Sequence, residues 1–214
     1  MISVFGSSLT KKLVMALAGL FLILFLIVHL SINLLLLSDN PVKFNNAAHF
    51  MASNKIIKIF EVFLFLVFII HIIWGLILQI QNWCARPKRY IRHHSSQISF
   101  FSKYMIYLGG IILIFLIIHF LNFYFVKLGW VQGDPENFYG MAYELFKIPV
   151  YSIIYVICFL FLAFHLHHAF QSAFQTIGLN HPKYTPAIKF IGVLYSIIIP
   201  LGFSIIPVII YFFK

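Results

Sequence analysis

Imidazole side chains occur where the sequence is otherwise almost wholly apolar. Six such histidines are present, at positions His29, His71, His119, His165, His167 and His168. The ring nitrogens of histidine can donate or accept hydrogen bonds, transfer protons or bind a metal. Because a polar group in hydrocarbon is costly unless it has a partner, these residues are candidates for a shared chemical role.

Five apolar stretches are each long enough to cross a membrane, and the histidines lie on the first four of them. The chain has 214 residues, of which 62% are hydrophobic and 9% are charged. A helix needs about 20 apolar residues to cross hydrocarbon about 30 Å thick. The stretches that meet this requirement are Leu13 to Leu37, Ile57 to Ile80, Tyr104 to Val126, Val150 to Phe174 and Phe190 to Phe213. We predict an all-α membrane protein, one transmembrane domain over residues 1–214, with the first four helices forming the histidine-bearing bundle.

Other sequence features refine this prediction. Pro200 and Pro207 predict a kink in the fifth helix. Cys84 and Cys158 are far apart and form no C-x-x-C motif, so the cysteines predict neither a zinc site nor an iron–sulfur site. No cleavable signal peptide is expected, because the first apolar stretch is too long for one.

Positive charges predict the orientation of the chain. The formal net charge is +10, but the basic residues lie between apolar stretches, where they set topology and meet lipid headgroups rather than nucleic acid. They are dense before the first stretch and in the second connection, at Lys11, Lys12, Arg86, Lys88, Arg89, Arg92 and Lys103. The acidic residues all lie toward the other face. We therefore predict a cytoplasmic N-terminus and an outer C-terminus.

Depth in the membrane groups four histidines into two pairs. A helix advances about 1.5 Å per residue. On this scale His29 and His119 lie at similar depths toward the outside, whereas His71 and His165 lie toward the cytoplasm. The two layers are expected to be on the order of 10 Å apart.

Paired imidazoles at one depth predict a haem. Two histidines that face each other from two helices are the axial ligands of a b-type haem, and two layers predict two haems. Such ligation leaves no open iron position, which suits electron transfer rather than oxygen chemistry. Small residues are expected to make room for the macrocycles: Gly75 and Ala169, one turn beyond the inner histidines, and Gly19 and Gly109, about 15 Å before the outer ones.

Simpler interpretations exist for these residues. A single histidine within a membrane is more commonly a hydrogen-bond donor between helices, and glycine is common in membrane helices. His165 and His168 share a helix face, so either is a candidate for the fourth ligand. We favour His165, with His168 as a partner for a haem propionate or a carbonyl group.

Three motifs give the chain a resemblance to a known family. They are VHLSINLL from residue 28, EVFLFLVFIIHIIWG from residue 61, and FHLHHAFQSAFQTIGLNHPKYTP from residue 164. Together with the five spans, they resemble the single-chain, dihaem cytochrome b subunit of succinate dehydrogenase, a kind shared with some fumarate reductases. The resemblance implies that His29 and His119 hold the distal haem and that His71 and His165 hold the proximal one.

The resemblance also implies partners and a location. A flavoprotein subunit oxidises succinate, an iron–sulfur subunit relays electrons, and this chain anchors both in the bacterial inner membrane and passes electrons to a quinone, menaquinone in the dihaem kind. Some fumarate reductases of this kind carry a glutamate two residues before the fourth ligand, where this chain has Ala163. This departure favours succinate oxidation as the working direction.

Two polar residues near the outer layer are further candidates. Glu61 lies ten residues before His71, about 15 Å outward, and is a candidate for proton exchange at a quinone site. A carboxylate that simply reaches interfacial water is the alternative. Asn33, one turn beyond His29, is expected either to line the quinone pocket or to cap the helix end.

Other protein classes share some of these features. Dihaem anchors of hydrogenases, formate dehydrogenases and nitrate reductases also place histidines in helical bundles. A transporter with a histidine proton relay would need more Asp, Glu, Asn or Gln in its spans than this chain has. A purely structural anchor would not need four histidines.

Overall fold

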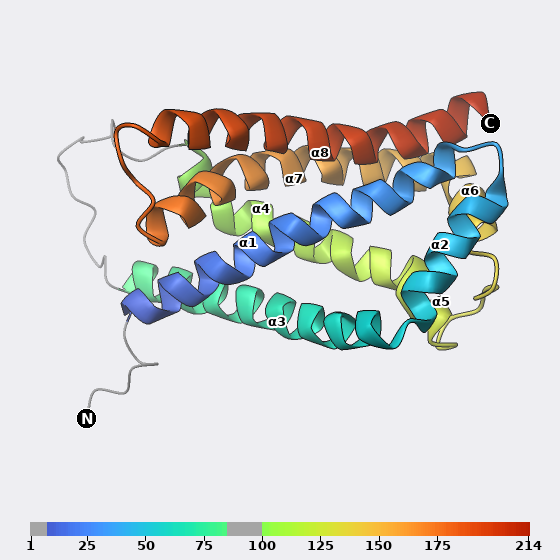
Figure 1. Ribbon diagram of the computed structural model, residues 1–214, viewed down its shortest axis with the longest axis horizontal. Helices are drawn as coiled ribbons and strands as arrows, with labels where there is room; N and C mark the ends of the chain where they lie inside the picture. The colour runs from blue at the N-terminus through green and yellow to red at the C-terminus, as the bar shows by residue number, and fades with distance from the viewer. Residues whose placement is uncertain (1–7, 85–99) are drawn as a thin grey trace.

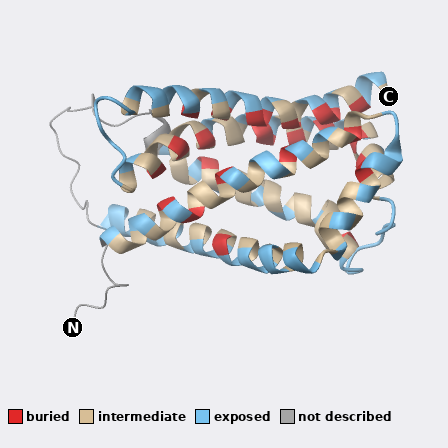
Figure 2. Cartoon of the chain, viewed as in Figure 1, coloured by how far each residue is buried: buried red, intermediate tan, exposed pale blue. Residues whose placement is uncertain are grey.

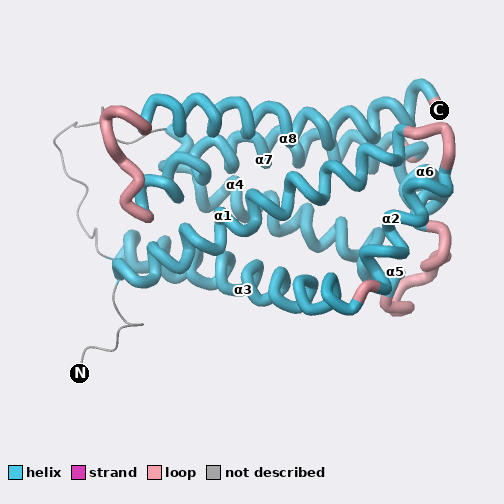
Figure 3. Tube along the Cα trace, viewed as in Figure 1, coloured by secondary structure: helices cyan, strands magenta, loops and turns pink. Residues whose placement is uncertain are grey.

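The structure, a computed structural model, describes residues 8–84 and 100–214, and it is helical along most of that length (Figure 1). The long helices are α1 (Ser8–Asn33), α3 (Lys55–Cys84), α4 (Phe100–His119), α7 (Pro149–Thr176) and α8 (Thr185–Phe213). The short elements are η2 (Leu34–Leu37), α2 (Pro41–Ser53), η3 (Phe120–Tyr124), α5 (Phe125–Lys127) and α6 (Phe138–Lys147). Loops lie at the two ends of the bundle (Figure 3), and the described residues contain no strand.

The prediction of five membrane-spanning helices is confirmed. Five segments are long and apolar enough to cross a membrane: Leu9–Leu37, Lys55–Cys84, Tyr104–Lys127, Pro149–Thr176 and Thr185–Phe213. Each contains the stretch predicted from the sequence and most extend beyond it by several residues. Because the number of spans is odd, the start of the first span and the end of the last lie at opposite ends of the bundle. Figure 1 shows this for the start of α1 and the end of α8. The Arg-rich connection that carried the orientation prediction lies outside the described residues.

The spans α1, α3, α4 and α7 form a four-helix arrangement, and α8 packs along α7 on its outside (Figure 1). Around this arrangement α1 packs on α3 and α7, and α4 packs on α7 and more lightly on α3. The pairs α1–α4 and α3–α7 are therefore diagonally opposed. Neither diagonal pair is among the helix pairs that pack closely in the described chain.

Two of the predicted connections contain helices that the apolar pattern did not reveal. Helix α2 begins after Asn40, whose side-chain oxygen accepts the amide hydrogen bond of Val42. Helix α6 begins after Asn137, which caps the amide of Gly140 in the same way. Asn45 of α2 joins the two helices, because its amide nitrogen donates to Asn137 and its oxygen accepts from the backbone of Tyr139. These polar contacts close one end of the bundle, called the outer end here after the predicted orientation.

Helix α8 continues through both of its prolines. Pro200 and Pro207 lie inside an unbroken helix, on the face that is buried against the bundle. Each lacks an amide hydrogen and so cannot complete the helical hydrogen bond to the preceding turn. The hydroxyl of Ser204 donates to the carbonyl of Pro200 at 2.8 Å. Packing against α7 and the outer end thus holds the helix together where its own hydrogen bonds are missing.

The closest packing lies on one side of the molecule. The larger buried cluster joins residues of α1, α2, α6, α7 and α8, among them Leu30, Phe44, Phe146, Phe159 and Phe203. Figure 2 shows buried positions along α7 and α8, whereas α3 is mostly intermediate or exposed. Only 6% of the apolar stretch of α3, and 6% of that of α4, is buried inside the protein, against 39% for α8. Helices α3 and α4 therefore expose most of their apolar surface, and they pack only lightly on each other.

Glycine at position 192 lets α8 approach α7 closely. A Cβ atom there would lie 2.8 Å from Cδ1 of Phe170, whose ring is buried. Gly192→Ala is expected to lower the free energy of unfolding by about 1–3 kcal/mol through overpacking. The measurement is circular dichroism of the full chain in mixed micelles as the fraction of dodecyl sulfate rises.

Gly110→Ala is the matched control for this substitution. A Cβ atom at Gly110 would meet nothing within 4 Å. Both substitutions gain the same intrinsic helix propensity, about 1 kcal/mol relative to glycine, so Gly110→Ala is expected to leave stability unchanged or raise it. Equal effects of the two substitutions would contradict close α7–α8 packing at Gly192.

Candidate functional site

The outer pair of histidines, His29 and His119, meets across one diagonal of the bundle. His29 comes from α1 and His119 from the last residue of α4, and their ring centres are 5.8 Å apart with the planes at 90°. Aromatic rings surround them. Phe25 stacks on His29 at 5.2 Å, and Phe123 and Phe115 lie 5.3 Å and 5.9 Å from His119. Apolar rings therefore contact both histidines of the outer pair.

The inner pair, His71 and His165, meets across the other diagonal. His71 comes from α3 and His165 from α7, with ring centres 6.4 Å apart and planes at 73°. The Nδ1 atoms of both rings are buried and have no hydrogen-bond partner among the described residues. A buried nitrogen without a partner costs free energy. The described chain therefore leaves one polar atom of each inner ring without a partner.

The two levels are separated along the helices that cross them. Gly19 lies beside the inner pair, because a Cβ atom there would be 3.8 Å from Cε1 of His71. Gly109 lies beside it too, at 4.0 Å from Cε1 of His165. His29 and His119 follow these glycines by ten residues, about 15 Å of helix. Where α1 and α4 pass the inner pair, each thus presents a residue without a side chain.

The remaining predicted small residues lie nearby but contact other groups. A Cβ atom at Gly75 would be 3.6 Å from Cε of Met15, on the neighbouring helix α1. Ala169 is half-buried, one turn beyond His165. His168 is half-buried on the same helix, and the ring that lies beside His71 is that of His165.

The geometry of both pairs fits a metal held between two imidazoles. A metal with an imidazole nitrogen about 2 Å away on each side separates the two ring centres by about 6 Å. The observed separations of 5.8 Å and 6.4 Å match this spacing. All four histidine side chains also keep partial accessibility, even though their helices enclose them. A haem fits this donor set, since it needs two opposed imidazoles and room between helices that do not touch.

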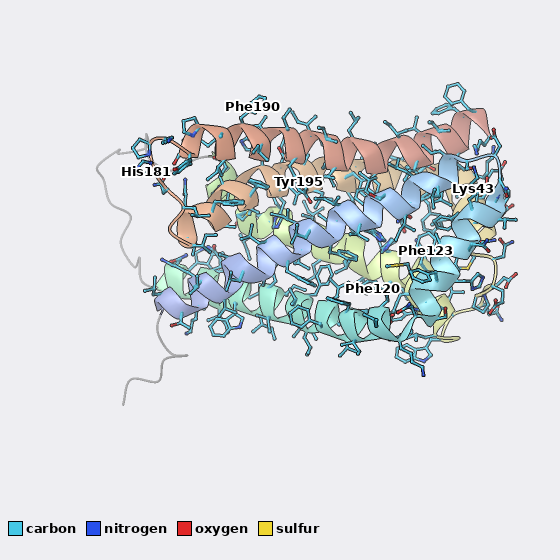
Figure 4. All side chains as sticks on the ribbon, in the orientation of Figure 1. Lys43, Phe120, Phe123, His181, Phe190 and Tyr195 are labelled. Carbon is cyan, nitrogen blue, oxygen red and sulfur yellow. The ribbon has the colours of Figure 1, made fainter. Side chains whose placement is uncertain are left out.

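A π-helical turn follows His119 immediately and was not predicted. Residues Phe120–Tyr124 form it, between α4 and the single turn α5. Such a turn holds one more residue than an α-helical turn and is frequent at functional sites. Phe120 and Phe123, labelled in Figure 4, belong to it, and it also carries Asn122. The apolar sequence gives no signal for this change of helix type.

Polar side chains contact the outer pair, whereas at the inner pair the backbone of Met15 hydrogen-bonds the ring of His71. The hydroxyl oxygen of Tyr155 lies 3.5 Å from Nδ1 of His119 and 3.1 Å from the amide nitrogen of Asn122. Asn33 donates to the backbone carbonyl of His29 at 2.8 Å and lies 3.5 Å from Nδ1 of the same residue. Asn33 thus closes the end of α1, one of its two predicted roles. Sequence analysis missed Tyr155 and Asn122, because nothing in an apolar span distinguishes a tyrosine that contacts a histidine.

Glu61 is the centre of an ion-paired cluster that joins α3 to α5. Its carboxylate accepts hydrogen bonds from Lys127 at 3.1 Å, from Lys58 at 3.3 Å and from the hydroxyl of Tyr124 at 2.9 Å. Tyr124 ends the π-helical turn, and its ring is 4.9 Å from Phe65 on α3. Sequence analysis expected Glu61 near the outer level but did not identify its partners.

The fold and the facing rings define a class, a polytopic helical membrane protein with two opposed histidine pairs at two depths. Comparison of the chain with protein-family models, with curated proteins and with solved structures finds no match. The function of the chain is therefore inferred from its own residues and their geometry.

The ion-paired cluster leads to a prediction about stability. Lys127 is 20% exposed and Lys58 is 45% exposed, so Lys127 is the better shielded partner of Glu61. Lys127→Met is expected to cost about 1–3 kcal/mol of unfolding free energy, and Lys58→Met less than about 1 kcal/mol. Dodecyl sulfate titration of the two variants measures both. Equal losses would contradict the larger contribution assigned to Lys127.

Proposed function

We propose that this chain is the membrane-anchor cytochrome b of a succinate:quinone oxidoreductase, with two b haems between its helices. The observation that carries the proposal is the pair of opposed histidine rings at each of two depths, 5.8 Å and 6.4 Å apart, across the two diagonals of one bundle. One such pair would suit many proteins. Two pairs, one above the other between helices that do not pack on each other, suit a path for electrons across the membrane.

The chemistry of the site is electron transfer. A bound haem would supply one-electron transfer, and two histidine ligands on each haem would leave no room for a further ligand. His29 and His119 would hold the distal haem, and His71 and His165 the proximal one. The chain's own contribution is to fix the distance between the two levels, to exclude water and to leave room for the macrocycles at Gly19 and Gly109.

The quinone would exchange electrons near the outer level. Glu61 lies there among Lys58, Lys127 and the hydroxyl of Tyr124, a group of residues that can give and take protons at the membrane surface. Protons must enter or leave wherever a quinone is reduced or a quinol oxidised. Glu61 is the residue we assign to that exchange, with menaquinone as the quinone.

Partners supply the chemistry that this chain lacks. The described residues contain no cluster of three or more His, Cys, Asp or Glu suited to a metal ion, and oxidation of succinate requires a flavin and iron–sulfur relay. We assign these to a flavoprotein subunit and an iron–sulfur subunit docked at the inner end of the bundle. That end would face the cytoplasm of a bacterium. A dihaem anchor of a hydrogenase, a formate dehydrogenase or a fumarate reductase is the alternative, since the same two histidine pairs would serve it.

The haem content of the purified full chain is the first test. Two haems b per chain are expected from the pyridine haemochrome assay, together with sharp b-type bands in the reduced-minus-oxidised spectrum. His29→Ala or His119→Ala is expected to remove one centre, and His71→Ala or His165→Ala the other, because each iron loses one of its two protein bonds. A chain without protohaem would end the proposal.

Two histidine controls make this test specific. His49 lies on α2 at the outer end, where its ring contacts Glu136, so His49→Ala is expected to keep both haems. His168→Ala is expected to do the same. If His168→Ala loses the inner haem and His165→Ala keeps it, the fourth ligand is His168 and not His165.

Co-purification tests the partners. The tagged chain, isolated from the membranes of its own host, is expected to bring with it a flavoprotein and an iron–sulfur protein that reduce a quinone with succinate. Formate or hydrogen as the electron donor, with no succinate activity, would support the alternative anchors. A haem-loaded chain that brings neither partner would contradict the assignment to succinate oxidation.

A further inference from the structure

The hydroxyl of Tyr155 is the single side-chain hydroxyl found near a histidine of the two pairs among the described contacts. Tyr155 is on α7, across from the end of α4, and is 2% exposed. Its oxygen lies 3.5 Å from Nδ1 of His119. A buried tyrosine hydroxyl ordinarily has a hydrogen-bond partner, so this contact needs a chemical explanation.

The position of the hydroxyl is fixed by its surroundings. Phe115 and Phe146 meet the Tyr155 ring edge-to-face at 4.9 Å and 5.1 Å, and Phe159 lies 6.0 Å away. Asn122, from the π-helical turn, donates to the oxygen at 3.1 Å. The ring therefore has little freedom, and the oxygen is held where His119 can reach it.

We infer that Tyr155 is a positioning residue of the outer centre, whose hydroxyl oxygen accepts a hydrogen bond from Nδ1 of His119 and so orients the imidazole for iron. This inference rests on the proposed function. If Nε2 binds the metal, Nδ1 carries the proton and is available to donate it to an acceptor. A phenolic oxygen has two lone pairs, so it takes one bond from Asn122 and a second from His119.

The inner pair offers the contrast. The Nδ1 atoms of His71 and His165 have no hydrogen-bond partner in the described chain. The contact at His119 is thus a specific feature of the outer level and not a general property of histidines in this bundle. Asn122 acts through Tyr155, since it contacts the hydroxyl.

The electronic effect has a definite sign. A hydrogen bond accepted from Nδ1–H makes the imidazole a stronger donor to its metal, and a stronger donor favours the oxidised, more positive iron. Tyr155→Phe removes the acceptor and keeps the ring. The midpoint potential of one haem is therefore expected to shift to a more positive value, while that of the other haem stays unchanged.

The experiment is a redox titration of the full haem-loaded chain, monitored by optical spectroscopy. Electron paramagnetic resonance records the low-spin ferric signals of the same samples. The ferric signal of the same haem is expected to move in Tyr155→Phe, because those signals depend on the orientation of the axial rings. Asn122→Ala is expected to move the potential of the same haem by a smaller amount. In the double variant it should add nothing to the shift of Tyr155→Phe, because both act through one oxygen.

Tyr195→Phe is the matched control. Tyr195, labelled in Figure 4, is on α8, and its hydroxyl donates to the backbone carbonyl of Ile23 at 2.7 Å. Tyr195→Phe removes a hydroxyl that, like that of Tyr155, makes a hydrogen bond between helices, but its described partner is a backbone carbonyl and not a histidine of either pair. Both potentials are expected to stay at their wild-type values in this variant.

The outcomes separate this inference from the proposed function. A wild-type chain without haem refutes the proposed function. A wild-type chain with two haems whose potentials and ferric signals are unchanged in Tyr155→Phe refutes the role of Tyr155 alone. Equal shifts of both haems, or the same shift in Tyr195→Phe, refute it as well, because they would report general loosening of the bundle. If Tyr155→Phe does not accumulate, an unchanged potential in Asn122→Ala refutes the role.

Discussion

The structure depends on two contacts between imidazole rings that join helices which otherwise do not pack on each other. In a four-helix arrangement, neighbours touch along their length and diagonal partners stand apart. Here each diagonal is crossed by one pair of histidines, His29 with His119 and His71 with His165. Helices α3 and α4 expose most of their apolar surface and pack only lightly on each other.

The closest packing lies on the other side of the bundle. Helix α8 lies along α7, and the main buried cluster joins both to α1 and to the short helices of the outer end. Phe203 connects this cluster to the outer pair, because its ring lies 5.7 Å from His29 and 5.3 Å from Phe159. The well-packed side of the protein therefore sets the position of α1 and α7, and each of these helices contributes one histidine to a pair.

Much of this arrangement could be predicted from the sequence, for physical reasons. Length and apolarity determine where helices cross a membrane, and a fixed rise per residue relates position in the sequence to depth. That is why His29 could be expected level with His119 and Gly19 near His71. Helices α2 and α6 were missed because they depend on Asn40 and Asn137 as caps and on contacts across the outer end. The role of Tyr155 depends on rotation about the helix axes, which an apolar span does not encode.

The π-helical turn after His119 has a consequence for how the third span can change over evolution. It behaves as a one-residue insertion, and one residue corresponds to a rotation of about 100° in an α-helix. Deleting a residue from Phe120–Tyr124 would restore regular winding and turn the last part of the span away from α3. Either His119 would then no longer contact His29, or Tyr124 and Lys127 would no longer hydrogen-bond Glu61. The extra residue thus lets the direction of side chains within the membrane, such as His119, be set separately from that of side chains near the surface, such as Lys127.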